Sequence, residues 1–319
     1  MRDPSEQDTI PPPLRGTALG RAETWPPTPT AAVSLDAFGI TDRGKVREDN
    51  QDHFYLGQIG RFSRILTTSL PKGELPDTFE HANHVAVVAD GMGGHKGGEV
   101  ASRTAIIVFF HLLFDTPDWV LRVDEDNVQK ILDRTATRYR SLDELLAERA
   151  RVDPELSGMG TTMTLTYSIG LDLFLAHVGD SRAYLCREGV LRQLTRDHTH
   201  VQQLVDAGML TREQAATHRL RNVLTNVLGG GMPLNDVDVH RVGLAPGDVV
   251  LLCSDGLYDV VTDEEITSVL SGADSAREAC RRLIDLALAR SAPDNVTVVV
   301  SRYGQAAGRE RSTEAELNP

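Results

Sequence analysis

Four aspartates in this 319-residue chain stand at the ends of apolar segments. Asp90, Asp180 and Asp255 each close an apolar run and are followed by glycine or serine, in "VVADG", "HVGDS" and "LLCSDG". Asp294 instead precedes such a run, in "APDNVTVVV". A single Asp-Gly or Pro-Asp-Asn is ordinary turn chemistry. Four carboxylates in such places predict that strand ends bring them together in space.

A cluster of carboxylates has a restricted chemistry. Carboxylates within a few ångströms of one another repel, so protons or cations must neutralise them. Oxygen ligands are those that Mg²⁺ and Mn²⁺ prefer, and the sequence contains neither HExxH nor CxxC, which are typical of zinc sites. Two such ions about 3.5–4 Å apart clamp a phosphate ester and lower the pKa of a bridging water. The pattern therefore predicts phosphoester hydrolysis by a metal-activated water.

Glycine and arginine add to this pattern. Glycines are concentrated directly after Asp90, in "DGMGGHKGG". At Gly91 the backbone can pass close to an ion, where a carbonyl oxygen can serve as a ligand. Arg47, in "TDRGKVREDNQDHF", follows the expected strand "LDAFGITD", and its planar guanidinium can bind two phosphate oxygens. Each feature alone also fits a flexible turn or a solvated surface, so their weight comes from their combination.

The elements that must position these residues are mostly strands. Six segments are rich in β-branched and aromatic residues and are bounded by turn signals, which predicts strands. They are residues 84–90, 161–169, 172–180, 182–187, 248–255 and 295–303. The connections "SIGLD" and "GDSR" are short enough to join neighbouring antiparallel strands as hairpins.

Helices are predicted between and after these strands. Apolar residues spaced i, i+3, i+4 and i+7 predict a helix over 275–290, and 98–114 and 126–150 are also expected to be helical. Ser275 with Glu278, and Thr262 with Glu265, have the spacing of capping boxes. Strand meanders with helices grouped apart indicate an α+β fold. We expect a four-layer α-β-β-α sandwich, in which two antiparallel sheets pack face to face and helices lie outside.

Composition sets the domain organisation and excludes some partners. We expect a proline-rich, flexible tail over 1–34, one catalytic domain over 35–303 and a flexible tail over 304–319. The net charge of -13 argues against nucleic-acid and membrane binding. The three cysteines lie among apolar neighbours and favour free buried thiols in a reducing compartment. The first residues lack the apolar stretch of a secretion signal, and no apolar run has membrane-spanning length, so we predict a cytoplasmic protein.

Taken in order, five blocks resemble one known family. The blocks are "TDRGKVREDNQD", "VADGMGGHKGGEVAS", "GMGTTMT" with "AHVGDSRAY", "LLCSDGL" and "APDNVTVVV". They are similar to the metal-dependent PP2C-type (PPM) serine/threonine protein phosphatases, especially the bacterial branch. The resemblance extends from about residue 36 to 303. It implies a β-sandwich flanked by helices, with two Mn²⁺ or Mg²⁺ ions at one end and phosphorylated proteins as substrates.

The resemblance also implies roles for individual residues. Asp90 would bridge both ions, and the Gly91 carbonyl would bind one of them. Asp255 and Asp294 would complete the shell of the other ion. Arg47 matches the arginine that receives the substrate phosphate.

Other positions match less directly. Asp52 would hold metal-bound water, and Asp180 would bind a third, weaker ion together with Asp255. Gln51 stands where eukaryotic members carry glutamate, so the metal contact of that glutamate does not transfer. His95 lies three residues beyond the place of the general-acid histidine of those members, and it serves either as that acid or in packing of the loop.

The remaining expectations concern the flap and partners. Residues 194–232 match the bacterial flap beside the active site, where His198 and His218 are expected to pack or cap. A monomer that reverses the action of a serine/threonine protein kinase on its targets is the expected setting. The alternative is a non-catalytic PP2C-like protein that binds phosphoproteins or senses metal. Such proteins have usually lost a clamp carboxylate, and all are present here.

Overall fold

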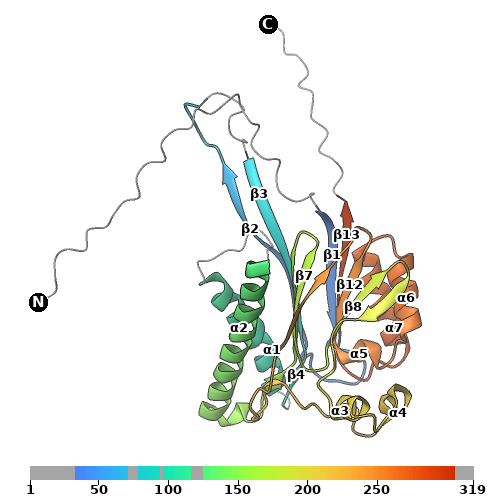
Figure 1. Ribbon diagram of the computed structural model, residues 1–319. Helices are drawn as coiled ribbons and strands as arrows, with labels where there is room; N and C mark the ends of the chain where they lie inside the picture. Colours follow the sequence, from blue (N-terminus) through green and yellow to red (C-terminus); the bar gives the residue numbers. More distant parts are fainter. Residues whose placement is uncertain (1–32, 71–77, 94–95, 116–124, 306–319) are drawn as a thin grey trace, which may run out of the picture.

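The computed structural model describes residues 33–70, 78–93, 96–115 and 125–305 (Figure 1). Of the expected tails, 1–34 and 304–319, all but the residues at 33–34 and 304–305, which belong to the strands β1 and β13, lie outside the described residues, and so does His95. The predicted domain boundaries and the role of His95 therefore stay predictions.

Two five-stranded antiparallel sheets form the centre of the molecule. The first has the order β1-β13-β12-β8-β9, and its strands are β1 (Val33–Asp42), β13 (Val296–Gln305), β12 (Val249–Cys253), β8 (Arg182–Arg187) and β9 (Val190–Gln193). The second has the order β11-β7-β6-β3-β2, and its strands are β11 (Asp238–Gly243), β7 (Asp172–Val178), β6 (Met163–Ile169), β3 (Thr78–Ala89) and β2 (His53–Arg64). A short third sheet joins β10 (Leu228–Gly229), β5 (Gly160–Thr161) and β4 (Gly91–Met92). All six predicted strands are present.

The predicted four layers are confirmed (Figure 1). Apolar side chains from both large sheets form the middle core, because alternate residues of each strand point toward the facing sheet. Helices α1 (Gly97–Phe114) and α2 (Glu125–Val152) cover the outer face of one sheet, and α6 (Asp263–Gly272) and α7 (Ala276–Ala289) cover the other. The smaller helices are α3 (His200–Asp206) and α4 (Arg212–Ala216) of the flap, α5 (Asp255–Tyr258) and the 3₁₀ turn Pro154–Leu156.

The helix starts follow the sequence signals with one difference. Thr262 and Glu265 form the full capping box of α6. At α7 the Ser275 hydroxyl accepts the expected bond from the Glu278 N–H. The Glu278 carboxylate, however, accepts from the N–H of Asp274 at 2.9 Å and not from that of Ser275. The α7 prediction was therefore half right, since a carboxylate on a flexible stem can reach either neighbouring N–H.

The connection "GDSR" is not a hairpin, contrary to the prediction. Strands β7 and β8, which it joins, belong to different sheets, so the chain crosses from one sheet to the other there. Gly179 makes this crossing with φ of +109°, and a Cβ atom at this position would lie 2.5 Å from the Thr162 side chain. The crossing places Asp180 at the end of the sandwich, between the sheets. The other short connection, "SIGLD", is a hairpin between β6 and β7, as predicted.

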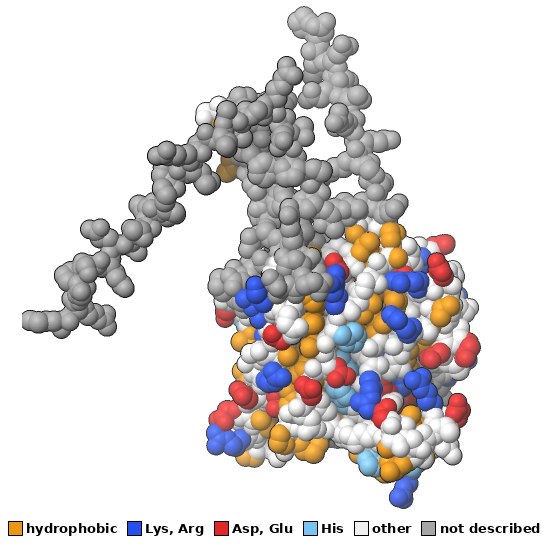
Figure 2. Space-filling view, in the orientation of Figure 1, with side chains coloured by type: hydrophobic (Ala, Val, Ile, Leu, Met, Phe, Trp, Pro, Cys, Tyr) orange, Lys and Arg blue, Asp and Glu red, His pale blue; other side chains and the backbone are white. Residues whose placement is uncertain are grey.

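Of the expectations drawn from composition, the free and buried thiols are confirmed. Acidic and basic side chains are interspersed over the face in Figure 2. The cysteines Cys186, Cys253 and Cys280 are free and buried. Among the described helices, α1 alone is long and apolar enough to match a membrane span, and half of it is buried inside the fold against the sheet.

Candidate active site

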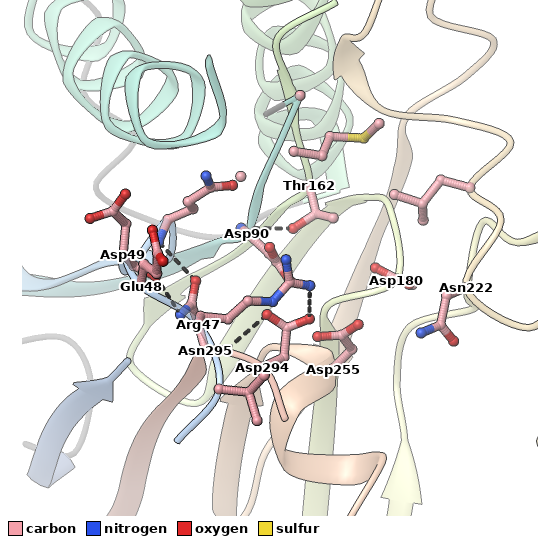
Figure 3. A pocket seen from close by; sticks show the side chains of 16 residues that line it. Arg47, Glu48, Asp49, Asp90, Thr162, Asp180, Asn222, Asp255, Asp294 and Asn295 are labelled. Carbon is pink, nitrogen blue, oxygen red and sulfur yellow. Dashed lines mark hydrogen bonds and ion pairs between the residues drawn. The ribbon is translucent and has the colours of Figure 1, made fainter. Parts of the chain in front are cut away.

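A pocket of about 570 Å³ opens at the end of the sandwich where the strand-end carboxylates meet (Figure 3). Six of the eight predicted site residues line it: Arg47, Asp90, Gly91, Asp180, Asp255 and Asp294. Of the other two, Asp52 is buried, and His95 lies outside the described residues. Convergence of residues that lie up to 247 positions apart, as in the Arg47–Asp294 pair, confirms the spatial prediction.

Each carboxylate reaches the pocket from a different strand end. Asp90 follows β3, and Asp180 lies on the crossing between β7 and β8. Asp255 begins α5 directly after β12, while Asp294 precedes β13. The first two therefore depend on one sheet and the last two on the other. The packing of the two sheets sets the distance between the two groups.

Backbone hydrogen bonds fix Asp90 at the pocket floor. Its N–H donates to the Thr162 hydroxyl at 3.0 Å, and its carbonyl accepts from the Thr162 N–H at 2.9 Å. The Thr161 hydroxyl donates to the same carbonyl at 2.8 Å. With both backbone groups held by the neighbouring strand, the point from which the Asp90 side chain enters the pocket is fixed.

Burial and mutual repulsion perturb these acids strongly. Burial raises the pKa of Asp90 well above its ordinary value, and the charges of Asp52 and Asp255 raise it further. Burial likewise raises the pKa of Asp255, with Asp180 and Asp294 as the next causes. Burial also raises the pKa of Asp180 to about 7. Strongly perturbed acids in one cleft are typical of functional sites.

Asp52 lies behind this group and is only 3% exposed. Its Oδ2 accepts hydrogen bonds of 2.7 Å from the hydroxyls of Ser254 and Thr297. These hydroxyls lower its pKa, but burial outweighs them and raises it to about 6. Among the described residues, no hydrogen-bond donor contacts Oδ1 of Asp52 or Oδ1 of Asp255, and both atoms are buried. Buried acceptors without donors are costly, so their presence fits a cation-binding role.

The donor set fits divalent ions such as Mg²⁺ and Mn²⁺ but is spread out. In the part of the chain that the structure describes, no three acidic, histidine or cysteine side chains approach closely enough to enclose an ion. Like charges favour separation, and Arg47 holds Asp294 through a 2.6 Å ion pair. The ligand roles therefore stay predictions, although all carboxylates lie in or beside one pocket.

Glycine at position 91 has a steric reason. A Cβ atom there would lie 2.2 Å from the Gly98 carbonyl oxygen and 2.8 Å from that of Gln51. The backbone after Asp90 is thus packed between two other backbone segments. The sequence suggested that glycine lets the backbone at position 91 approach an ion. In the structure, packing against the neighbouring backbone segments already requires glycine there.

Several residues of the site escaped the sequence argument. Asn295 accepts from the Gln51 N–H at 2.8 Å and donates to the carbonyls of Arg43 and Asp49 at 2.9 Å each, so it holds the loop of Arg47. Its signal was its place in "APDNV", where only the aspartate was interpreted. Thr162 and the flap residue Asn222 also line the pocket; Thr162 lies in the block "GMGTTMT", where no single residue was interpreted, and nothing in the local sequence distinguishes Asn222.

The flap histidines have the predicted packing roles. His198 Nδ1 accepts from the Gly179 N–H at 3.2 Å, and its Nε2 lies 3.3 Å from Asp238. His218 Nδ1 accepts from the Leu220 N–H at 3.2 Å. Neither lines the pocket.

Comparison with known proteins gives one consistent result. The family model described as protein phosphatase 2C matches residues 77–291. The serine/threonine protein phosphatase PstP of Mycobacterium tuberculosis is 39% identical over 270 residues, which are 83% of this chain. This chain spans only 45% of the length of that protein. The serine/threonine phosphatase Stp of Listeria innocua is 32% identical, with 85% of this chain and 98% of the relative covered.

Solved structures agree with the sequence relatives. The catalytic domain of PstP, crystallised in complex with two manganese ions, is 36% identical and superposes with a TM-score of 0.67. The alignment covers 86% of this chain and all of that domain. The sequence relatives and the structural neighbours therefore point to the same protein family.

Proposed function

Because the chain belongs to the protein phosphatase 2C family, we propose that it hydrolyses phosphoserine and phosphothreonine on proteins with the help of divalent metal ions. The observation that carries the proposal is the pocket in which Asp90, Asp255 and Asp294 lie beside Arg47. Support comes also from the PstP catalytic domain, whose structure holds two manganese ions and whose whole length aligns with 86% of this chain.

The carboxylates are assigned as ligands of two Mn²⁺ or Mg²⁺ ions. Asp90, Asp255 and Asp294 line the pocket together with Gly91, whose carbonyl is assigned as a further ligand. Asp52, buried beside the pocket, would hold water bound to these ions. Asp180, with Asp255, is assigned to a third and weaker ion. When bound, such ions polarise the phosphoryl group and lower the pKa of water.

Arg47 is assigned to the substrate phosphate. Its side chain is 57% exposed and lies across the pocket mouth, with one guanidinium nitrogen on Asp294. The planar fork can turn from this carboxylate to two phosphate oxygens without leaving the pocket. His95 remains the proposed proton donor to the leaving oxygen, with packing of its loop as the competing role.

The biological setting is proposed from the family. Substrates would be phosphoproteins modified by a serine/threonine kinase of the same cell, and the enzyme would act as a cytoplasmic monomer. The named relatives are serine/threonine protein phosphatases of bacteria, which supports the substrate class.

Replacement of Asp90 by Asn tests the proposal. The variant keeps the backbone bonds to Thr161 and Thr162 but loses the central charge. We expect phosphate release from a phosphothreonine peptide with Mn²⁺ to fall by at least a thousandfold. Asp172→Asn, at the start of β7 and paired with Arg241, is the control and should keep wild-type turnover.

A non-catalytic, phosphoprotein-binding protein is the remaining alternative. The complete set of carboxylates speaks against it. Isothermal titration that detects phosphopeptide binding to the wild type, with no phosphate released in the presence of Mn²⁺, would establish that alternative and refute hydrolysis.

A further inference from the structure

Arg182 is the first residue of β8, and all three nitrogens of its guanidinium donate hydrogen bonds. Its Nε and one terminal nitrogen donate to the two Asp197 carboxylate oxygens at 3.0 and 2.7 Å. Its other terminal nitrogen donates to the Tyr184 hydroxyl at 2.9 Å. Arg182 and Asp197 side chains are 22% and 11% exposed, so this ion pair is largely shielded from solvent.

The flat face of the same guanidinium packs on α5. Its central carbon lies 3.6 Å from the centre of the Tyr258 ring, a cation–π contact. The Tyr258 hydroxyl in turn donates to the backbone carbonyl of Asp180 at 3.0 Å. Tyr258 ends the one-turn helix that Asp255 begins. Arg182 therefore supports, through one aromatic ring, the segments that carry two of the pocket carboxylates.

The edge of the guanidinium holds the beginning of the flap, which we define as the flap root (residues 194–199). Besides the Asp197 ion pair, the flap root contacts the Asp180 turn through His198, whose N–H donates to the Gly179 carbonyl at 2.7 Å. The far end of the flap has its own anchor, because Arg221 pairs with Asp259 directly after α5. The flap root, the Asp180 turn and α5 thus meet around the guanidinium of Arg182.

We propose that Arg182 is a positioning residue that holds the flap root, the Asp180 turn and α5 in the arrangement needed for metal and substrate binding. The inference rests on the proposed function and adds a residue that does not touch the pocket. Lysine cannot replace it, because an ammonium group lacks the fork that binds Asp197 and the flat face that covers Tyr258. Residues that orient ligands in this way typically contribute ten- to hundredfold to metal affinity.

The test compares Arg182→Lys with a matched control on the same strand. Arg187 also makes a two-point ion pair, at 2.8 and 2.6 Å, with the buried Asp248, but at the opposite end of β8. Mn²⁺ binding to the full chain is measured by isothermal titration calorimetry. We expect Arg182→Lys to weaken it about ten- to hundredfold, while Arg187→Lys binds Mn²⁺ like the wild type.

Kinetics and a second variant complete the experiment. With saturating Mn²⁺, Arg182→Lys should raise KM for a phosphothreonine peptide more than KM for p-nitrophenyl phosphate, since the longer peptide can contact more of the flap than the small ester. Tyr258→Phe keeps the ring but loses the hydrogen bond to the Asp180 carbonyl, so it should weaken Mn²⁺ binding about threefold or more. This variant tests the same contact chain if Arg182→Lys does not fold.

The outcomes separate this inference from the proposed function. Wild-type Mn²⁺ affinity in both Arg182→Lys and Tyr258→Phe overturns the positioning role, as does an equal loss in Arg187→Lys. Failure of the wild-type chain to bind Mn²⁺ or to release phosphate refutes instead the function on which the inference rests.

Discussion

The guanidinium of Arg47 lies 2.6 Å from the carboxylate of Asp294, so the residue proposed to bind phosphate contacts a residue proposed to bind metal. Asp294 is the first cause of the raised pKa of Arg47, with the charges of Asp255 and Asp90 as further causes. Arg47 thus supplies positive charge to the acidic pocket. The guanidinium of Arg47 can therefore pair either with Asp294 or with the substrate phosphate.

Replacement of Arg47 by alanine should separate the two roles. We expect KM for a phosphothreonine peptide to rise about ten- to hundredfold, because a charge-assisted contact worth about 1.5–3 kcal/mol is lost. Mn²⁺ affinity should stay equal or rise by up to about fivefold, since an exposed ion pair contributes about 0–1 kcal/mol. Steady-state kinetics and calorimetric titration with Mn²⁺ provide the two readouts.

Two further variants sharpen this comparison. Arg47→Lys keeps the charge without the fork and should recover only part of the peptide affinity. Asp294→Asn should lose Mn²⁺ affinity as well as turnover. If Arg47→Ala lost Mn²⁺ affinity to the same degree as Asp294→Asn, the proposed division of roles would be wrong.

Gly91→Ala tests the close approach of backbone beside Asp90. The new Cβ would lie 2.2 Å from the Gly98 carbonyl oxygen, and neither backbone segment can move without disturbing β4 or the start of α1. We expect a loss of about 2–4 kcal/mol in the free energy of unfolding and of most Mn²⁺ affinity. Urea denaturation and titration calorimetry measure these changes. Gly243→Ala is the control, because a Cβ atom there meets no other atom within 4 Å.

The sequence predicted the layers and the pocket carboxylates because both depend on local patterns. Alternating β-branched residues define strands wherever they pair, and an aspartate at a strand end stays at that end. The connection "GDSR" was misread because a short turn permits a hairpin but does not require one. Which sheet β8 joins is decided by its pairing with β12, about 65 residues later in the chain.

The supporting contacts could not be predicted in this way. Asn295 and Arg182 act on segments distant in sequence, and their partners are known only once the fold is known. The same holds for the hydroxyls of Ser254 and Thr297, which meet at Asp52 from two different strand ends. Residues that touch an ion or substrate leave a local motif, whereas residues that orient them depend on tertiary contacts.

Thr297→Val removes one of the two hydroxyls that stabilise the charge of Asp52. Burial already raises the pKa of Asp52 to about 6, and loss of a lowering hydrogen bond raises this pKa further. We expect Mn²⁺ affinity to fall severalfold at pH 6 and less at pH 8, because a metal ion must displace the proton at the lower pH. Calorimetric titration at the two pH values measures this. Thr166→Val, a buried threonine of β6, should leave both affinities unchanged.

His177 should make the metal-free protein sensitive to acid. Its ring is buried in β7, with Nδ1 2.8 Å from the Thr164 hydroxyl and Nε2 3.2 Å from the Arg196 carbonyl. Burial, followed by the neighbouring His198, lowers the pKa of His177 to about 4 from its ordinary value of 6.5. Between these values the unfolded chain binds the proton and the folded chain does not. The stability that His177 contributes is therefore complete above about pH 6.5 and is lost as the pH falls toward 4.

His177→Gln removes this titration while keeping a polar side chain of similar reach. We expect the difference in free energy of unfolding between wild type and variant to shrink by about 1.4 kcal/mol per pH unit below pH 6.5. Urea denaturation with a metal chelator at pH 7, 6 and 5 measures this difference. The carboxylates around the pocket titrate in both proteins, so their contribution cancels in the comparison. A constant difference across the three pH values would show that His177 binds its proton equally well in the folded and unfolded chains.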